Sequence, residues 1–225
     1  MNNLTDSPVG TAAFWVNIEA NNGFDFNYIV DSTTLRTYIS SGDVFVDFPI
    51  ITSPPGTATA NYRSIGGTIT IGSGFHHVLT SWDVSGASFV GSIYVDDALD
   101  FLLTNYTLDG TIPWYSLEVM TIMGHKQFPG GGIFSNTLRG CLAQLYINPG
   151  VYMDFSIVSN RRKFITAGLN VVDLGANGEL PTGTSPRFYM TGGITGSTTF
   201  LPNSGTFDRP LVASSQLFNC PTEAP

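Results

Sequence analysis

Charged residues, and basic residues above all, are scarce in this sequence of 225 residues. Charged side chains make up 12% of it, and 9 lysines and arginines stand against 17 aspartates and glutamates, giving a formal net charge of −8. A nucleic-acid partner requires a basic surface that displaces counterions from phosphates, so we expect none. Hydrophobic residues make up 42%, which argues against a disordered chain and for a sizeable core.

Long apolar runs and cysteines are also in short supply. No run approaches the roughly 20 apolar residues of a membrane span, so no membrane partner is expected. Residues 1–6 have neither the basic nor the apolar part of a secretion signal, and we expect a chain made in a host cytoplasm that leaves it, if at all, by another route such as lysis. The sequence has two cysteines, Cys141 and Cys220. Two buried thiols are the favoured interpretation, and a single bridge between them is the alternative.

Glycine and proline are plentiful by comparison. The 25 glycines and 13 prolines are spread along the whole chain, which indicates many turns and few long helices. We therefore predict an all-β fold, an antiparallel β-sandwich with at most one or two short helices. A leader over residues 1–10 precedes one domain over residues 11–220, and residues 221–225 form a tail. No internal repeat and no long linker divides the chain.

The clearest local pattern is a hairpin formed by residues 74–83 and 84–97, two β-rich runs that flank a polar joint over residues 83–87. Val78, Thr80 and Trp82 share one face of the first run, while His77 and Leu79 lie on the other. The second run alternates in the same way, and a short polar joint connects the two. Both faces carry bulky side chains, so we expect this strand pair to be covered on at least one side within a sandwich.

This hairpin resembles the central hairpin of laminin-G-like domains of the concanavalin A-like lectin/glucanase superfamily. Residues 76–78 read His-His-Val, residues 82–83 read Trp-Asp, and residues 94–96 read Tyr-Val-Asp. The family pattern continues each of the last two motifs with glycine, where this chain has Val84 and, after a second aspartate, Ala98. The resemblance covers roughly residues 12–147 and implies a concanavalin A-like jelly roll.

A second resemblance concerns the region that follows. Short matches between residues 148 and 190, including Asn-Arg-Arg-Lys-Phe-Ile at 160–165 and Leu-Pro-Thr-Gly at 180–183, resemble the C-terminal extension of laminin-G-like proteins encoded by tailed bacteriophages and prophages. We assign residues 148–220 to this extension, within the same domain. The resemblance implies a part of a phage particle.

Alternation and turn residues place the remaining elements. Strands are predicted within residues 11–19, 26–30, 35–39, 43–48, 62–71, 112–123, 138–147, 187–190, 198–201 and 211–218, while residues 99–108 fit a strand or a helical turn. In the run over 138–147, Leu142, Gln144 and Tyr146 are predicted to share one face. One helix is predicted over residues 154–165, capped by Asp154 and ending in three bases that face solvent.

No catalytic motif is apparent. The β-glucan-cleaving enzymes of the superfamily carry two glutamates flanking an aspartate on one strand, whereas none of the four glutamates here has a second within forty residues. A Gly-x-Ser-x-Gly elbow and a phosphate-binding loop are absent as well. We expect no enzymatic activity, with no catalytic residues and no cofactor.

Two groups of side chains have the chemistry of metal ligands. His76 and His77 point to opposite faces of a strand and cannot easily hold one ion, so one packed and one exposed histidine is favoured. Aspartates cluster near the ends of the hairpin, and some laminin-G-like domains bind Ca²⁺ through loop carboxylates. Solvated turn aspartates are the commoner outcome, and we predict no metal site.

Three aromatic residues are candidates for binding sugar rings by stacking. Tyr106, Trp114 and Tyr115 lie in or near expected loops. Aromatic residues in a sandwich are more often part of the core, and this alternative stays open.

Together these observations predict a non-enzymatic structural protein of a bacteriophage virion, used as a capsid decoration, head-fibre or tail-associated module. Its expected partners are other virion proteins, in a homo-oligomer or on a lattice. The alternative is a lectin-like module that recognises a glycan of the bacterial surface. A glycoside hydrolase is the least favoured interpretation.

Overall fold

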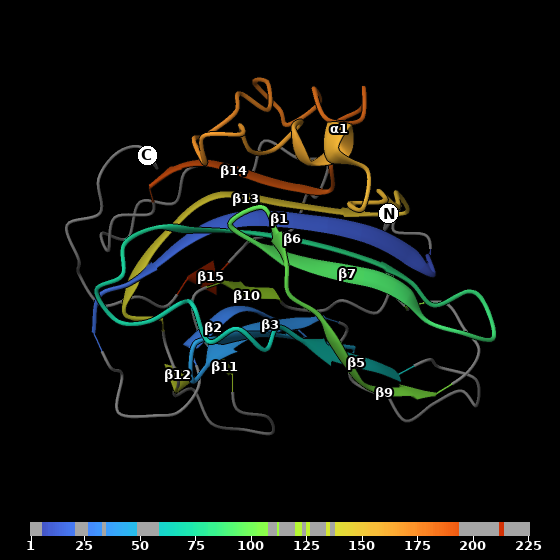
Figure 1. The fold of residues 1–225 in the computed structure, drawn as a ribbon, viewed down its shortest axis with the longest axis horizontal. Coiled ribbons are helices and arrows are strands. Elements are labelled where there is room, and N and C mark those ends of the chain that lie inside the picture. The colour runs from blue at the N-terminus through green and yellow to red at the C-terminus, as the bar shows by residue number, and fades with distance from the viewer. Residues whose placement is uncertain are drawn as a thin grey trace.

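The computed structural model describes residues 6–20, 27–32, 35–48, 59–107, 112, 120–122, 125–126, 134–135, 138–193 and 212–213. Two sheets are stacked, and a segment with little regular structure lies against the outer face of one of them (Figure 1). The prediction of an all-β sandwich is confirmed. The division of the chain into leader, domain and tail stays a prediction.

The first sheet has six strands. In spatial order they are β14 (Phe188–Gly193), β13 (Gly140–Pro149), β1 (Val9–Ile18), β6 (His76–Asp83), β7 (Val90–Val95) and β8 (Ala98–Leu99). All of its strand pairs are antiparallel.

The second sheet has seven strands. Their order is β15 (Val212–Ala213), β10 (Met120–Ile122), β2 (Asn27–Ser32), β3 (Arg36–Ser40), β4 (Asp43–Asp47), β5 (Thr59–Arg63) and β9 (Leu102–Thr107). Its pairs are antiparallel except β10 with β15, which is parallel. β11 (His125–Lys126) and β12 (Phe134–Ser135) form a separate pair.

The predicted hairpin is present as β6 and β7. Val78 pairs with Val95 and Asp83 with Val90 in an unbroken antiparallel register. The two faces separate as alternation requires: Val78 and Trp82 belong to the core between the sheets, and Leu79 belongs to a second core on the outer face.

Two hydrophobic cores result, one on each side of the six-stranded sheet. The core between the two sheets is the larger and contains Phe14, Val16 and Ile18 of β1, as predicted. The second core lies between the outer face of the six-stranded sheet and the segment that follows β13. Its buried members are Ala13, Trp15, Leu79, Tyr94, Ala143, Tyr146, Met153, Phe155, Phe164, Ile165, Leu174 and Tyr189. The molecule therefore has three layers instead of the two of a simple sandwich.

The predicted faces of the strand over 138–147 are wrong beyond its midpoint. Gln144 has a φ of 46°, and the pairing of β13 shifts register between Ala143 and Leu145. This β-bulge reverses the alternation, so that Leu142 and Leu145 both enter the core between the sheets while Tyr146 faces the second core. The Gln144 side chain donates a hydrogen bond to the Val172 carbonyl at 3.1 Å, which ties the bulge to the outer layer.

The predicted helix is much shorter than expected. Only α1 (Val158–Arg161) is helical, and the N-cap residue that precedes it, Ile157, makes no side-chain cap. Asp154 instead accepts a hydrogen bond from the backbone N–H of Ser156 at 2.9 Å, which favours a turn. Phe155 and Phe164 are both buried in the second core, so the segment between them is shaped by these two anchors.

Other predicted strands differ from the observed ones or lie partly outside the described residues. The strand expected over 62–71 ends at Arg63, and residues 102–107 of the ambiguous run form β9. Of the strand predicted over 112–123, only residues 112 and 120–122 are described, and of that over 211–218 only residues 212–213. The strand predicted over 198–201 lies outside the described residues.

Candidate functional site

Polar contacts concentrate at one end of the β6–β7 hairpin, where the chain turns from β7 into β8. Asp96 and Asp97 form this turn with φ values of 49° and 67°, a backbone conformation that is uncommon for residues other than glycine. Both carboxylates are engaged by groups from distant parts of the sequence.

Asp96 holds both histidines of the His-His pair. Its Oδ1 accepts a hydrogen bond from the backbone N–H of His77 at 2.9 Å, and its Oδ2 lies 2.7 Å from Nδ1 of His76. On the other side of the imidazole, Nε2 of His76 lies 2.8 Å from Oγ of Ser73. The side chain of His76 is only 13% exposed, so the expectation of one exposed histidine is wrong.

Ser73 stands on an exposed turn that leads into β6. Its hydroxyl donates a hydrogen bond to the carbonyl oxygen of Thr70 at 2.6 Å and accepts one from the Thr70 N–H at 3.1 Å. Ser73, His76 and Asp96 therefore form a continuous hydrogen-bonded chain of hydroxyl, imidazole and carboxylate. Sequence analysis missed Ser73, and the only local signal was its position between Gly72 and Gly74.

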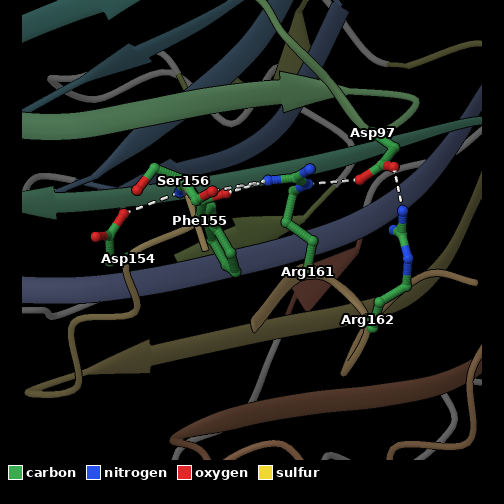
Figure 2. A network of polar contacts seen from close by, with 6 residues as sticks. All are labelled: Asp97, Asp154, Phe155, Ser156, Arg161 and Arg162. Atoms are coloured by element: carbon green, nitrogen blue, oxygen red, sulfur yellow. Dashed lines mark hydrogen bonds and ion pairs between the residues drawn. The ribbon is translucent and has the colours of Figure 1, made fainter. Parts of the chain in front are cut away.

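Asp97 joins the hairpin to the outer layer (Figure 2). Its Oδ1 lies 2.6 Å from Nε of Arg161, and its Oδ2 lies 2.6 Å from Nη2 of Arg162. The hydrogen bond from Arg162, followed by the hydrogen bond from Arg161, lowers the pKa of Asp97 to about 2 against an opposing effect of desolvation. The prediction that these bases end a helix in solvent is wrong for Arg161 and Arg162.

Arg161 also organises the segment on which it lies. Its Nη1 donates to the carbonyl oxygen of Phe155 at 2.6 Å, and its guanidinium lies 4.7 Å from the centroid of the Tyr94 ring. Figure 2 shows the side chain reaching from the Phe155 carbonyl to the Asp97 carboxylate. One arginine thus links the start of the outer layer, its helix and the β7–β8 turn.

Replacing Asp97 by asparagine is expected to lower the free energy of unfolding by about 1–2 kcal/mol, because two arginines lose the charge that they pair with. Urea denaturation at pH 7 measures the change. Asp154→Asn is the matched control: the new side chain can still accept the Ser156 N–H, and stability should stay within about 0.5 kcal/mol. Equal effects of the two substitutions would contradict the assigned role of Asp97.

His77 is the most deeply buried titratable group in this region. It is 2% exposed, and its ring packs against that of Trp15 in a tilted arrangement, with centroids 4.7 Å apart. Its Nδ1 has no hydrogen-bond partner within the described structure. Desolvation lowers the pKa of His77 to about 3, and the nearby Asp97 carboxylate opposes this only partly. His77 is therefore neutral in the folded protein near pH 7.

The other hairpin aspartates have structural partners as well. Asp83 accepts hydrogen bonds from the backbone and hydroxyl of Ser85, and Asp100 accepts the N–H groups of Ile65 and Gly66. These hydrogen bonds are exposed, so the two carboxylates lie in turns partly open to solvent and have protein partners as well. Within the described ranges, no three His, Cys, Asp or Glu side chains gather in a way that suits a metal ion.

The three predicted glycan-binding residues are not brought together in the described structure. Tyr106 lies in β9, where its hydroxyl donates to the carbonyl oxygens of Val84 and Gly86 and its ring packs at 5.9 Å from Phe89. Trp114 and Tyr115 lie outside the described residues. Their role in glycan binding stays a prediction.

Cys141 is disulfide-bonded, so the favoured expectation of a free buried thiol is wrong. The sequence has one other cysteine, Cys220, which lies outside the described residues. We predict that a thiol reagent labels Cys141 in the unfolded protein only after reduction. Peptide mapping by mass spectrometry reads this out, and labelling of unreduced protein would contradict the bond.

Comparisons with known proteins give one weak structural similarity to report. No family model and no curated protein matches the chain. Among solved structures, the receptor-binding domain of botulinum neurotoxin type G is similar, with 11% sequence identity and a TM-score of 0.38. The match covers 69% of this chain and 38% of that structure. Values this low carry no argument about function.

None of the helices among the described residues is long and apolar enough to cross a membrane.

Proposed function

We propose that this chain is a structural component of a bacteriophage particle, serving as a capsid decoration, head-fibre or tail-associated module. Two resemblances support the proposal: residues 12–147 resemble laminin-G-like domains, and residues 148–190 resemble an extension found in phage-encoded members. Its partners would be other virion proteins, in a homo-oligomer or on a lattice. Its place would be the assembled virion.

The observation that carries the proposal is how the extension packs. Phe155, Phe164 and Leu174 are at most 1% exposed against the outer face of the six-stranded sheet. Asp97 fixes the same segment to the hairpin through Arg161 and Arg162. A body with two cores, whose outer layer is held by packing and by ion pairs, has the rigidity that a component of a repeating assembly needs.

Polysaccharide cleavage by a pair of glutamates is not part of this proposal. Glu19 lies just after β1, Glu179 lies in the outer layer, and Glu118 and Glu223 lie outside the described residues. The carboxylate oxygen of Glu179 accepts a hydrogen bond from the Asn177 N–H at 2.9 Å, which gives it a local structural role.

Mass spectrometry of purified particles from a phage that encodes this chain tests the proposal directly. We expect the polypeptide in stoichiometric amounts that survive density-gradient purification, at a position that electron microscopy can locate. Particles that assemble without the polypeptide, while infected cells contain it, would overturn the proposal. A glycan array with the purified chain tests the lectin-like alternative, which requires binding that is lost on replacing Trp114 or Tyr115 by alanine.

A further inference from the structure

The hydrogen-bonded chain formed by Ser73, His76 and Asp96 has the order and spacing of a nucleophile, a base and an orienting carboxylate. Oγ of Ser73 lies 2.8 Å from Nε2 of His76, and Nδ1 of the same ring lies 2.7 Å from Oδ2 of Asp96. Both distances fall in the range that proton transfer between such groups requires. The arrangement is recognised by geometry and not by position in the sequence.

The carboxylate is itself held in place. Oδ1 of Asp96 accepts the backbone N–H of His77 at 2.9 Å, and the backbone N–H of Asp96 donates to the carbonyl oxygen of His77 at 2.9 Å. These two contacts fix Asp96 against β6, the strand that begins at His76. With the proton of the imidazole on Nδ1, toward Asp96, Nε2 can accept the Ser73 hydroxyl proton once the hydroxyl turns away from the Thr70 carbonyl, to which it donates at 2.6 Å.

The serine is open to solvent. Ser73 is exposed, and a Cβ atom placed on Gly72 or on Gly74 would meet nothing within 4 Å. The backbone N–H of Gly74, the residue after the serine, donates to no acceptor in the described part of the chain. An N–H in that position is a suitable donor to an oxyanion.

We propose that Ser73, His76 and Asp96 form an acyl-transfer centre that acts on small carboxylic esters. Ser73 Oγ attacks the ester carbonyl carbon while His76 Nε2 takes the hydroxyl proton. The carbon–oxygen bond of the leaving alcohol breaks, and His76 returns the proton to that alcohol. A water molecule, deprotonated by His76, then attacks the acyl carbon. The bond between that carbon and Ser73 Oγ breaks, the acid leaves, and His76 returns the proton to Oγ. This activity goes beyond the structural role proposed above, and neither depends on the other.

A small ester is the substrate class that the surroundings favour. The serine projects from a turn with open space on both sides, which gives access to a short acyl group but few contacts that would hold a long chain. The Thr70 carbonyl competes with His76 for the Ser73 hydroxyl proton, at a distance of 2.6 Å from Oγ. In the free protein the hydroxyl is therefore not held in the hydrogen bond to His76 that the reaction needs. We therefore expect slow turnover.

The test combines a serine-reactive fluorophosphonate probe with hydrolysis of p-nitrophenyl acetate, using the full chain. We expect a covalent adduct that peptide mapping places on Ser73, and a burst of one p-nitrophenolate released per chain as the serine is acetylated. Ser73→Ala should abolish both, and His76→Asn should slow the labelling by at least about a hundredfold. Asp96→Asn should slow the labelling as well. This variant should still fold, because asparagine also tolerates the positive φ.

Ser85→Ala is the matched control. Ser85 is an exposed turn serine whose hydroxyl is hydrogen-bonded to a carboxylate at 2.6 Å, and its hydroxyl has no histidine partner among the described contacts. It should label and hydrolyse like the parent protein, and thermal unfolding should show that all variants are folded. Absence of an adduct on Ser73 in the folded parent would overturn the proposal. So would an adduct that forms at the parent rate in His76→Asn, because the serine would then react without its base.

Discussion

Replacing Phe164 by alanine is expected to lower the free energy of unfolding by about 3–5 kcal/mol, the usual cost of removing a buried aromatic ring. Phe164 is 1% exposed, and its ring meets the rings of Tyr146 and Phe155 edge to face, with centroids 5.1 Å and 5.8 Å away. Because Tyr146 belongs to β13 and Phe155 to the outer layer, the substitution opens a cavity where the two meet. Urea denaturation followed by tryptophan fluorescence measures the loss.

Leu180→Ala is the control for this prediction. Leu180 lies in the same outer layer but is 60% exposed, so its truncation should change stability by less than about 0.5 kcal/mol. A loss below about 1 kcal/mol for Phe164→Ala would show that the ring is not buried as described. Similar losses for the two variants would lead to the same conclusion.

Acidification is expected to destabilise the protein through His77. The pKa of His77 is lowered from 6.5 to about 3 in the folded state. Below about pH 6.5, His77 therefore binds a proton in the unfolded chain but stays unprotonated in the folded chain. The contribution of His77 is fully present above that pH and is lost as the pH falls toward 3. Between pH 7 and pH 5 the loss amounts to about 2 kcal/mol for this one group.

Substituting His77 by leucine removes the titrating group and separates its effect from that of other residues. The variant should show a flatter dependence of unfolding free energy on pH between 7 and 5, whatever its stability at pH 7. Asp97 does not interfere in this window, because its pKa is lowered from 3.8 to about 2 and its contribution is lost only at lower pH. An unchanged pH dependence in His77→Leu would contradict the assignment.

Much of the sandwich could be predicted because its strands alternate without interruption. The run from Val78 to Trp82 and the opening strand with Phe14, Val16 and Ile18 place their apolar residues as a period of two requires. Alternation fails at Gln144, where one residue in a left-handed conformation reverses the faces of β13. Nothing local in the sequence marks that residue, because the bulge is stabilised by the Val172 carbonyl of the outer layer.

The helix prediction failed for a related reason. Spacing and charge between residues 154 and 165 suit a helix. Arg161 and Arg162, however, form hydrogen bonds with Asp97, which lies more than sixty residues earlier in the sequence. Local sequence reports what a segment prefers in isolation, whereas here tertiary contacts decide its path. The same limit explains the missed polar site. Ser73 lies in the turn before β6, His76 begins β6 and Asp96 lies in the β7–β8 turn, and they meet only when β6 and β7 pair.

Hydrogen exchange of the intact chain, read by mass spectrometry, tests most directly whether the sandwich and its outer layer are one packed body. Amides with hydrogen bonds in the outer layer, such as those of Phe164 and Ile165, should be protected to the same extent as those of β13 and should open together with them. Fast exchange in residues 155–165 while β13 stays protected would contradict a three-layer body. The extension would then be a loosely attached segment, and the packing that supports a structural role in a particle would be gone.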